Sequence, residues 1–182
     1  MYHPLDSIPR GRRLATFLYL LAGTIVLSLA LRFVGPFVPN IVDFEFAGTV
    51  AQVTGILTAW DAVAKFRAGF NLGLDYLYMP LYSTTIALAC IWGARVLRGK
   101  VWNGIGIILA WCLWLAAIFD AVENYALVTM LFGAVVDPYP QIAQVCAACK
   151  FSLILLGLVY CALAAVIRIV LLIRPARNRQ TS

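Results

Sequence analysis

The sequence predicts an all-α, polytopic membrane protein: a four-transmembrane-helix bundle with an amphipathic helix in the first extracytoplasmic loop. Of its 182 residues, 63% are hydrophobic and only 12% are charged, whereas ordinary globular domains are about 25% charged. Four spans of about 20 residues with short connections use most of this length, so residues 1–182 are treated as a single integral membrane domain. The formal charge of +6 does not indicate nucleic-acid binding, because the basic residues cluster at predicted helix ends.

Apolar runs and the breaks between them place the spans. The first run follows three arginines and is longer than the core of a signal peptide, so we expect it to be a retained span that stops at Gly35-Pro36. The third and fourth spans are separated by a turn at Asp137-Pro-Tyr-Pro140, and the fourth ends at Arg174-Pro175. The expected spans are residues 14–34, 76–96, 101–132 and 142–173.

Basic residues predict the orientation. Because loops rich in Lys and Arg stay in the cytoplasm, both termini and the loop 97–101 are expected on the cytoplasmic side. Of the eight acidic residues, all except Asp6 fall in the opposite half. We therefore expect a multi-pass protein of a bacterial inner membrane. Ten of the 14 basic residues lie on the predicted cytoplasmic side: Arg10, Arg12, Arg13, Arg95, Arg98, Lys100, Arg168, Arg174, Arg177 and Arg179.

The long segment 35–73 between the first two spans has a helical pattern of its own. Its apolar residues recur at spacings of three and four, which predicts an amphipathic outer helix over about 44–66. A fifth span is the alternative, but only 15 residues run from Phe46 to Trp60, short of the ~20 that a span needs. The stripe consists of Phe46, Val50, Val53, Leu57, Trp60 and Ala64.

The third span carries an acidic face. Asp120, Glu123 and Asn124 stand at i, i+3 and i+4, so they share one side of a helix. Since a charge at the centre of a membrane helix costs roughly 2.5–3.5 kcal/mol on insertion scales, such residues suggest a functional site. Two carboxylates one turn apart could hold or relay a proton, which makes Asp120 and Glu123 the catalytic candidates. The alternative is polar packing between helices, with Lys150 as the counter-charge.

Counting residues predicts that the polar groups lie at one depth. Asp75, Asp120 and Lys150 stand 20, 20 and 24 residues from the basic residue that ends each span. At about 1.5 Å per residue, each lies ~30–36 Å from the cytoplasmic side, near the outer surface of the bilayer. The amphipathic helix is expected to lie across this layer.

Tyrosines of the second span extend the polar layer. Asp75, Tyr78 and Tyr82 stand at i, i+3 and i+7, so the two hydroxyls could line a pocket with Asp75 at its rim. The alternative for a tyrosine at this depth is the aromatic belt of the membrane surface. The predicted ligand-binding residues are Asp75, Tyr78, Tyr82, Asn124, Lys150, Trp60 and Asp61.

A C-x-x-C motif, Cys146-Ala-Ala-Cys149, opens the fourth span on the outer side, where thiols can be oxidised. With the long first outer loop and its helix, this arrangement resembles the vitamin K epoxide reductase family. The resemblance implies a quinone-linked thiol oxidoreductase in which Cys146 and Cys149 are the redox pair. The family's second cysteine pair, in the first outer loop, has no counterpart here, since residues 35–73 contain no cysteine.

The favoured function is binding or processing of a lipid-like or amphiphilic molecule in an outward-facing polar pocket between the second, third and fourth spans. Its partners would be membrane lipids or a hydrophobic small molecule. A different class is an accessory subunit whose apolar faces dock on a homo-oligomer or a larger membrane complex. The sequence indicates no metal, because the single histidine, His3, is expected at a flexible N-terminus away from every acid, and it identifies no cofactor.

Overall fold

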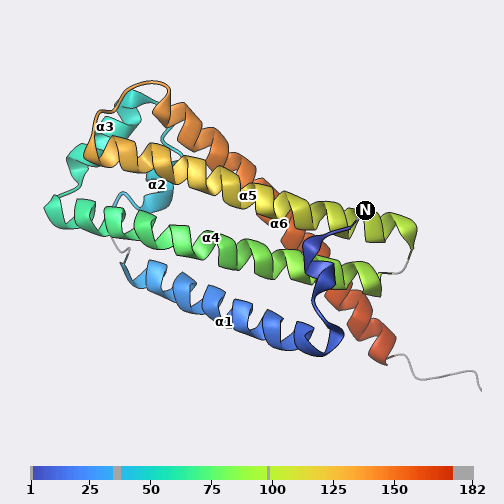
Figure 1. The fold of residues 1–182 in the computed structure, drawn as a ribbon. Coiled ribbons are helices and arrows are strands. Elements are labelled where there is room, and N and C mark those ends of the chain that lie inside the picture. The colour runs from blue at the N-terminus through green and yellow to red at the C-terminus, as the bar shows by residue number, and fades with distance from the viewer. Residues whose placement is uncertain (1, 35–37, 98, 174–182) are drawn as a thin grey trace, which may run out of the picture.

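The computed structural model is all-helical over the residues it describes, which are all except 1, 35–37, 98 and 174–182. Four of its helices are long and apolar enough to cross a membrane, which supports a multi-pass membrane protein. The short 3-10 helix η1 precedes the first of them, and two short helices, α2 and α3, follow it (Figure 1). The elements are η1 (Pro4–Ser7), α1 (Arg10–Val34), α2 (Ile41–Glu45), α3 (Val50–Ala59), α4 (Ala62–Val96), α5 (Lys100–Phe132) and α6 (Tyr139–Ile173).

Helix α4 is the centre of the arrangement, because it packs against α1, α5 and α6, while α5 and α6 also pack against each other. Glycines let these helices approach closely, as small residues commonly do in membrane proteins. A Cβ atom on Gly106 of α5 would lie 2.6 Å from the Tyr160 hydroxyl of α6 and 2.9 Å from the Cys90 carbonyl oxygen of α4. Helix α1 lies beside α4 (Figure 1), and none of its described side chains is buried.

The third and fourth long helices agree with the predicted spans to within three residues, and the first begins four residues early. The second does not: α4 starts at Ala62 rather than near residue 76. Asp61 caps it by accepting a hydrogen bond from the Ala64 amide at 2.7 Å. Asn71 donates to the Leu31 carbonyl oxygen of α1 at 3.1 Å, so a polar residue that interrupts the apolar run of α4 is paired with a neighbouring helix.

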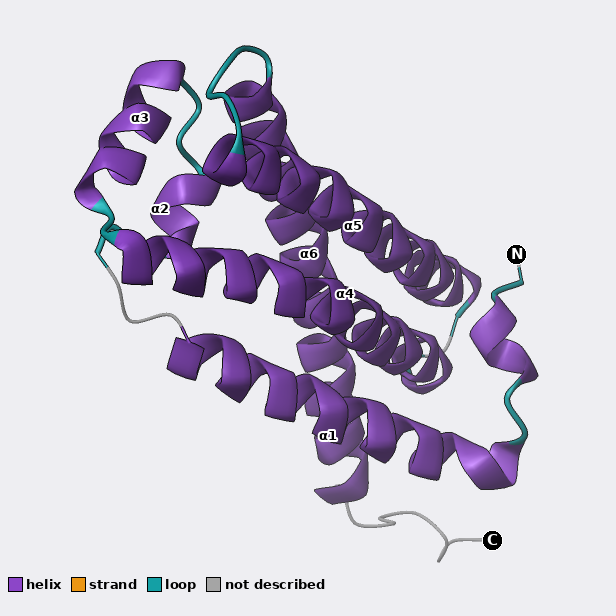
Figure 2. Cartoon of the chain, turned by 60° about the vertical axis from the view of Figure 1, so that its left-hand side comes forward, coloured by secondary structure: helices purple, strands orange, loops and turns teal. Residues whose placement is uncertain are grey.

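The prediction of one continuous amphipathic helix over 44–66 is wrong. The segment divides into α2, α3 and the first turn of α4, because three side chains cap new helices. Asn40 accepts hydrogen bonds from the amides of Val42 and Asp43, Thr49 accepts from Gln52, and Asp61 caps α4. Figure 2 shows α2 and α3 gathered at the end of the molecule where α5 turns into α6.

Some apolar residues of this divided segment nevertheless turn inward, and Val53 and Trp60 are the members of the predicted stripe that are buried. Phe44, Val53 and Trp60 are buried in one core cluster with residues of α4, α5 and α6. Phe46, in contrast, is 39% exposed. The segment is therefore a packed cap on one end of the long helices, and not a free helix lying on the membrane surface.

The N-terminus is also placed differently from the prediction. His3 is fully buried, and its ring lies 4.7 Å from that of Trp111 and 4.6 Å from that of Trp114 on α5. Asp6, in η1, forms a 2.8 Å ion pair with Arg95 of α4. The residues before α1 thus fold back onto α4 and α5, because two indoles and an arginine offer them partners that are remote in the sequence.

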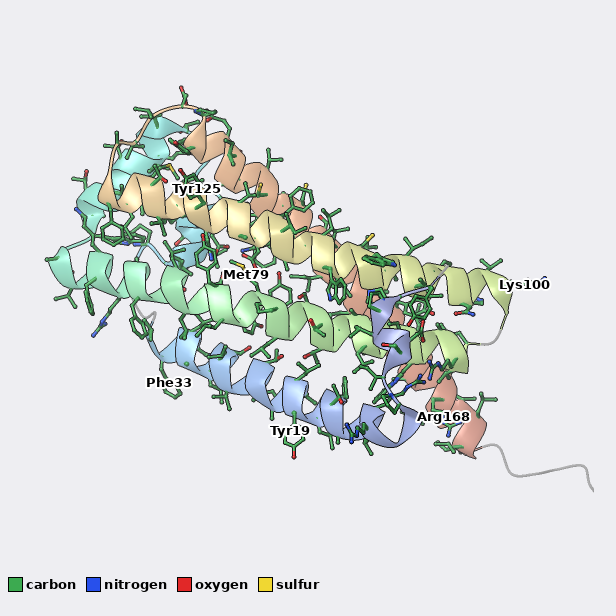
Figure 3. All side chains as sticks on the ribbon, in the orientation of Figure 1. Tyr19, Phe33, Met79, Lys100, Tyr125 and Arg168 are labelled. Carbon is green, nitrogen blue, oxygen red and sulfur yellow. The ribbon has the colours of Figure 1, made fainter. Side chains whose placement is uncertain are left out.

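Some sequence predictions concern residues outside the described part of the chain. These are the stop at Gly35-Pro36, the end at Arg174-Pro175, and the basic residues Arg98, Arg177 and Arg179. Among the described residues, Lys100 and Arg168 lie toward one end of the long helices, whereas Tyr125 and Phe33 lie toward the other (Figure 3).

Candidate functional site

Lys150 of α6 is the centre of a buried charge cluster. Its Nζ atom lies 2.7 Å from Asp120 Oδ1 and 2.9 Å from Glu123 Oε1, and it donates a hydrogen bond to each. Both carboxylates come from α5, one helical turn apart, so they face α6 together. All three side chains are at most 5% exposed. The acidic face and the lysine predicted to share one layer are thus in direct contact.

Helix α4 adds two further groups to this cluster. Tyr82 donates from its hydroxyl to Asp120 Oδ2 at 2.9 Å, and Asp75 Oδ2 accepts from Asn124 Nδ2 at 2.8 Å. Asn124 also lies beside the Leu72 carbonyl oxygen of α4, which it approaches at 3.5 Å. Polar groups of α4, α5 and α6 are therefore linked into one network, and the carboxylates at its centre are held in fixed positions.

A cavity of about 1190 Å³ borders this network. Five of the predicted site residues line it, namely Asp75, Tyr78, Tyr82, Asp120 and Lys150. Its walls come from α1, α2, α4, α5 and α6. The other lining residues are Leu21, Thr24, Leu31, Arg32, Asn40, Ile41, Val42, Glu45, Asn71, Leu72, Thr85, Ile86, Phe151, Ile154 and Leu158.

The polarity of the cavity changes along α4. Asn71, Asp75 and Tyr78 line one part of it, and Thr85 and Ile86 line another, roughly 15 Å further along the helix axis. The threonine hydroxyl at the second part is already satisfied, because it donates to the Leu81 carbonyl oxygen at 2.7 Å. The cavity thus has a polar end near the charge cluster and an effectively apolar end deeper along the helices.

Sequence reasoning missed two contributors to this site. Helix α1 forms one wall, and its contacts with α4 include a 3.0 Å hydrogen bond from Ser28 to the Tyr78 hydroxyl. Glu45 of α2 is 8% exposed, lines the cavity and has its Oε2 atom 3.9 Å from Lys150 Nζ. An acid beside the apolar stripe, between Phe44 and Phe46, was the only available signal for Glu45.

Burial governs the ionisation of Glu45. Desolvation is the main cause that raises the pKa of its carboxyl group to about 7; the Lys150 ammonium opposes this rise, and the nearby carboxylates of Asp75 and Asp120 add to it. A group with this pKa exchanges its proton near neutral pH. Glu45 therefore adds a titratable group to the polar end of the cavity.

Four of the other predicted residues do not line the cavity. Glu123 and Asn124 are completely buried behind it, where they hold Lys150 and Asp75. Trp60 and Asp61, predicted to bind ligand, do not line this cavity and make contacts within the fold. Trp60 donates from Nε1 to the Pro39 carbonyl oxygen at 2.7 Å and packs on Phe44, and Asp61 is the exposed cap of α4.

The cysteines of the C-x-x-C motif lie on α6. Cys146 is one helical turn before Lys150, and Cys149 directly precedes it. Cys146 is buried, Cys149 is half-buried, and both are free thiols. Another pair of cysteines, unexpected from the sequence, is in contact: the sulfur atoms of Cys90 on α4 and Cys161 on α6 are 3.6 Å apart. None of these four residues lines the cavity, so the redox role of Cys146 and Cys149 stays a prediction.

Comparison with family models, curated proteins and solved structures finds no match to this chain. The functional reading therefore depends on the geometry of the cavity and its charge cluster.

Proposed function

We propose that this chain is an integral membrane protein that binds a lipid-like or amphiphilic small molecule in the cavity between α1, α4 and α6. The observation that carries the proposal is the gradient along the cavity, with carboxylates and tyrosines at one end and aliphatic side chains at the other. Binding sites for small molecules typically have apolar walls and a few convergent polar groups. The volume of about 1190 Å³ is large enough for a molecule with a long chain.

The polar network also supports binding more than simple helix packing. An ion pair between α5 and α6 needs only Lys150 and one carboxylate, yet Asp75 and Tyr78 of α4 face the same space. These groups leave acceptors directed at the cavity, where a ligand can use them. In the proposed bundle of four spans, the molecule enters from the bilayer past α1, none of whose described side chains is buried.

The proposed topology has both termini in the cytoplasm and α2 and α3 outside. It is supported by Lys100 and Arg168, which lie toward the end of the long helices opposite to that end cap (Figure 3). Cells carrying Thr54→Cys, on α3, are expected to react with a membrane-impermeant maleimide while intact. Cells carrying Asn103→Cys, at the start of α5, are expected to react only after permeabilisation. The measurement is labelling above that of the unsubstituted protein, and the reverse pattern would contradict this orientation.

Binding in the cavity is tested with three radiolabelled probes that share a hexadecyl chain: hexadecyltrimethylammonium, hexadecanol and hexadecyl sulfate. At least one is expected to bind the protein in phosphatidylcholine nanodiscs above the level of protein-free nanodiscs. Leu158→Trp, which fills the cavity from α6, is expected to weaken that binding about tenfold, a loss of ~1.4 kcal/mol.

Leu156→Trp is the matched control for this substitution. Leu156 is on the same helix and is 55% exposed, like Leu158 at 49%, but it does not line the cavity. Two residues along a helix turn the side chain by about 200°, so the same tryptophan then faces away. Equal loss of binding in both variants, or no binding of any probe, would reject the cavity as the site.

A further inference from the structure

We infer that the polar end of the cavity selects a positively charged head group, so that the ligand is an amphiphile carrying a protonated amine or a quaternary ammonium. This inference deepens the proposed function and rests on it. The observation behind it is an imbalance between the negative and positive side chains around the polar end.

Acidic groups outnumber basic groups in the buried cluster. Glu45, Asp75, Asp120 and Glu123 surround this end of the cavity, and Lys150 is the buried ammonium among them. With every group ionised, four carboxylates face one ammonium. Because like charges in a poorly solvated place repel strongly, the cluster needs additional positive charge. A bound cation would supply it.

Two of the carboxylates that line the cavity keep acceptor capacity that no described group fully uses. Glu45 is 8% exposed, and its Oε2 atom has no hydrogen-bond partner among the described residues. Asp75 accepts from Asn124 at 2.8 Å, but within the described part of the chain no Lys, Arg or His nitrogen lies within 4.0 Å of it. Both line the cavity, from α2 and α4, so a head group between them would meet two carboxylates.

Aromatic rings stand beside these carboxylates. The ring centroids of Tyr78 and Tyr82 are 5.1 Å apart, and both residues line the cavity on the face of α4 that carries Asp75. Ring faces attract ammonium and quaternary ammonium groups, more so where water is excluded. Tyr82 is 3% exposed, which meets this condition. Carboxylates with neighbouring rings suit an organic cation.

Other charged ligands fit the cavity less well. An anionic head group would need Lys150, whose Nζ atom is already within 2.9 Å of two carboxylates, or Arg32, which is exposed. For a metal ion, the described residues contain no group of three or more His, Cys, Asp or Glu side chains arranged to hold one. The inference therefore concerns an organic cation.

The test compares the three hexadecyl probes on the full-length protein in phosphatidylcholine nanodiscs. Hexadecyltrimethylammonium is expected to bind at least about tenfold more tightly than hexadecanol, and hexadecyl sulfate most weakly. Asp75→Asn keeps the size of the side chain and the contact to Asn124. It is expected to weaken binding of the cation about tenfold more than binding of hexadecanol, and Asp75→Glu is expected to restore the preference.

Asp137→Asn is the control, because Asp137 is exposed in the turn before α6 and does not line the cavity. It is expected to leave the charge preference unchanged. Equal affinity for the cation and the alcohol, or preference for the sulfate, would overturn the inference while leaving the proposed function in place. An equal loss of cation and alcohol binding in the Asp75→Asn variant would also overturn the inference and leave the proposed function in place. Failure of every probe to bind would overturn the proposed function and this inference together.

Discussion

Replacing Lys150 with methionine is expected to lower the free energy of unfolding by about 3 kcal/mol. Methionine fills nearly the same volume, so the loss comes from charge and not from a void. The substitution removes the ammonium that lies 2.7 Å from Asp120 and 2.9 Å from Glu123, and it leaves uncompensated carboxylates in a buried place. The measurement is the unfolding free energy in bicelles, obtained by steric trapping.

The substitution Lys100→Met provides the control. Lys100 is exposed at the first residue of α5, where loss of a surface charge is expected to change stability by less than about 0.5 kcal/mol. At acidic pH, the free energies of unfolding of the Lys150→Met variant and the original protein should become more similar. Protons then neutralise the carboxylates that have lost the lysine. A Lys150→Met protein as stable as the original at neutral pH would mean that these acids are already protonated and that the lysine does not balance them.

The spans that could be predicted from the sequence are those bounded by local signals. Helices α5 and α6 lie where the apolar runs, the basic residues and the Pro-rich turn place them. The start of α4 could not be predicted, since Asn71 and Asp75 interrupt its apolar run. Their partners, the Leu31 carbonyl oxygen and Asn124, come from other helices. Hydropathy treats such residues as exposed to lipid or water, whereas in the fold they are paired with protein.

The candidate site, too, could be predicted from the sequence only in part. Asp120, Glu123 and Lys150 could be predicted to meet, because helical spacing and depth are properties of single helices. The part played by Glu45 and by α1 could not, because it depends on how the capped segment folds back over α6 and on which side of α4 the first helix packs. His3 illustrates the same limit, since its burial is decided by two tryptophans more than a hundred residues away.

Neutralising the whole charge cluster is expected to separate stability from function. The variant carries Glu45→Gln, Asp75→Asn, Asp120→Asn, Glu123→Gln and Lys150→Met. We expect it to unfold with nearly the free energy of the original protein, since removing all the charges together leaves no buried charge without a counter-charge. The amides also keep acceptors for the Tyr82 hydroxyl and the Asn124 side chain.

Binding in this neutralised protein is expected to change far more than stability. Hexadecyltrimethylammonium should lose its preference over hexadecanol, at least about a tenfold change, because no carboxylate is left at the polar end of the cavity. The two measurements are made on the same sample, so a folded protein without selectivity identifies the carboxylates as a binding site. A neutralised protein that folds and still prefers the cation would assign the cluster to helix packing alone. Lys150→Met by itself should show the opposite behaviour, with stability reduced and the preference for a cation kept, because its carboxylates remain and lack the Lys150 ammonium.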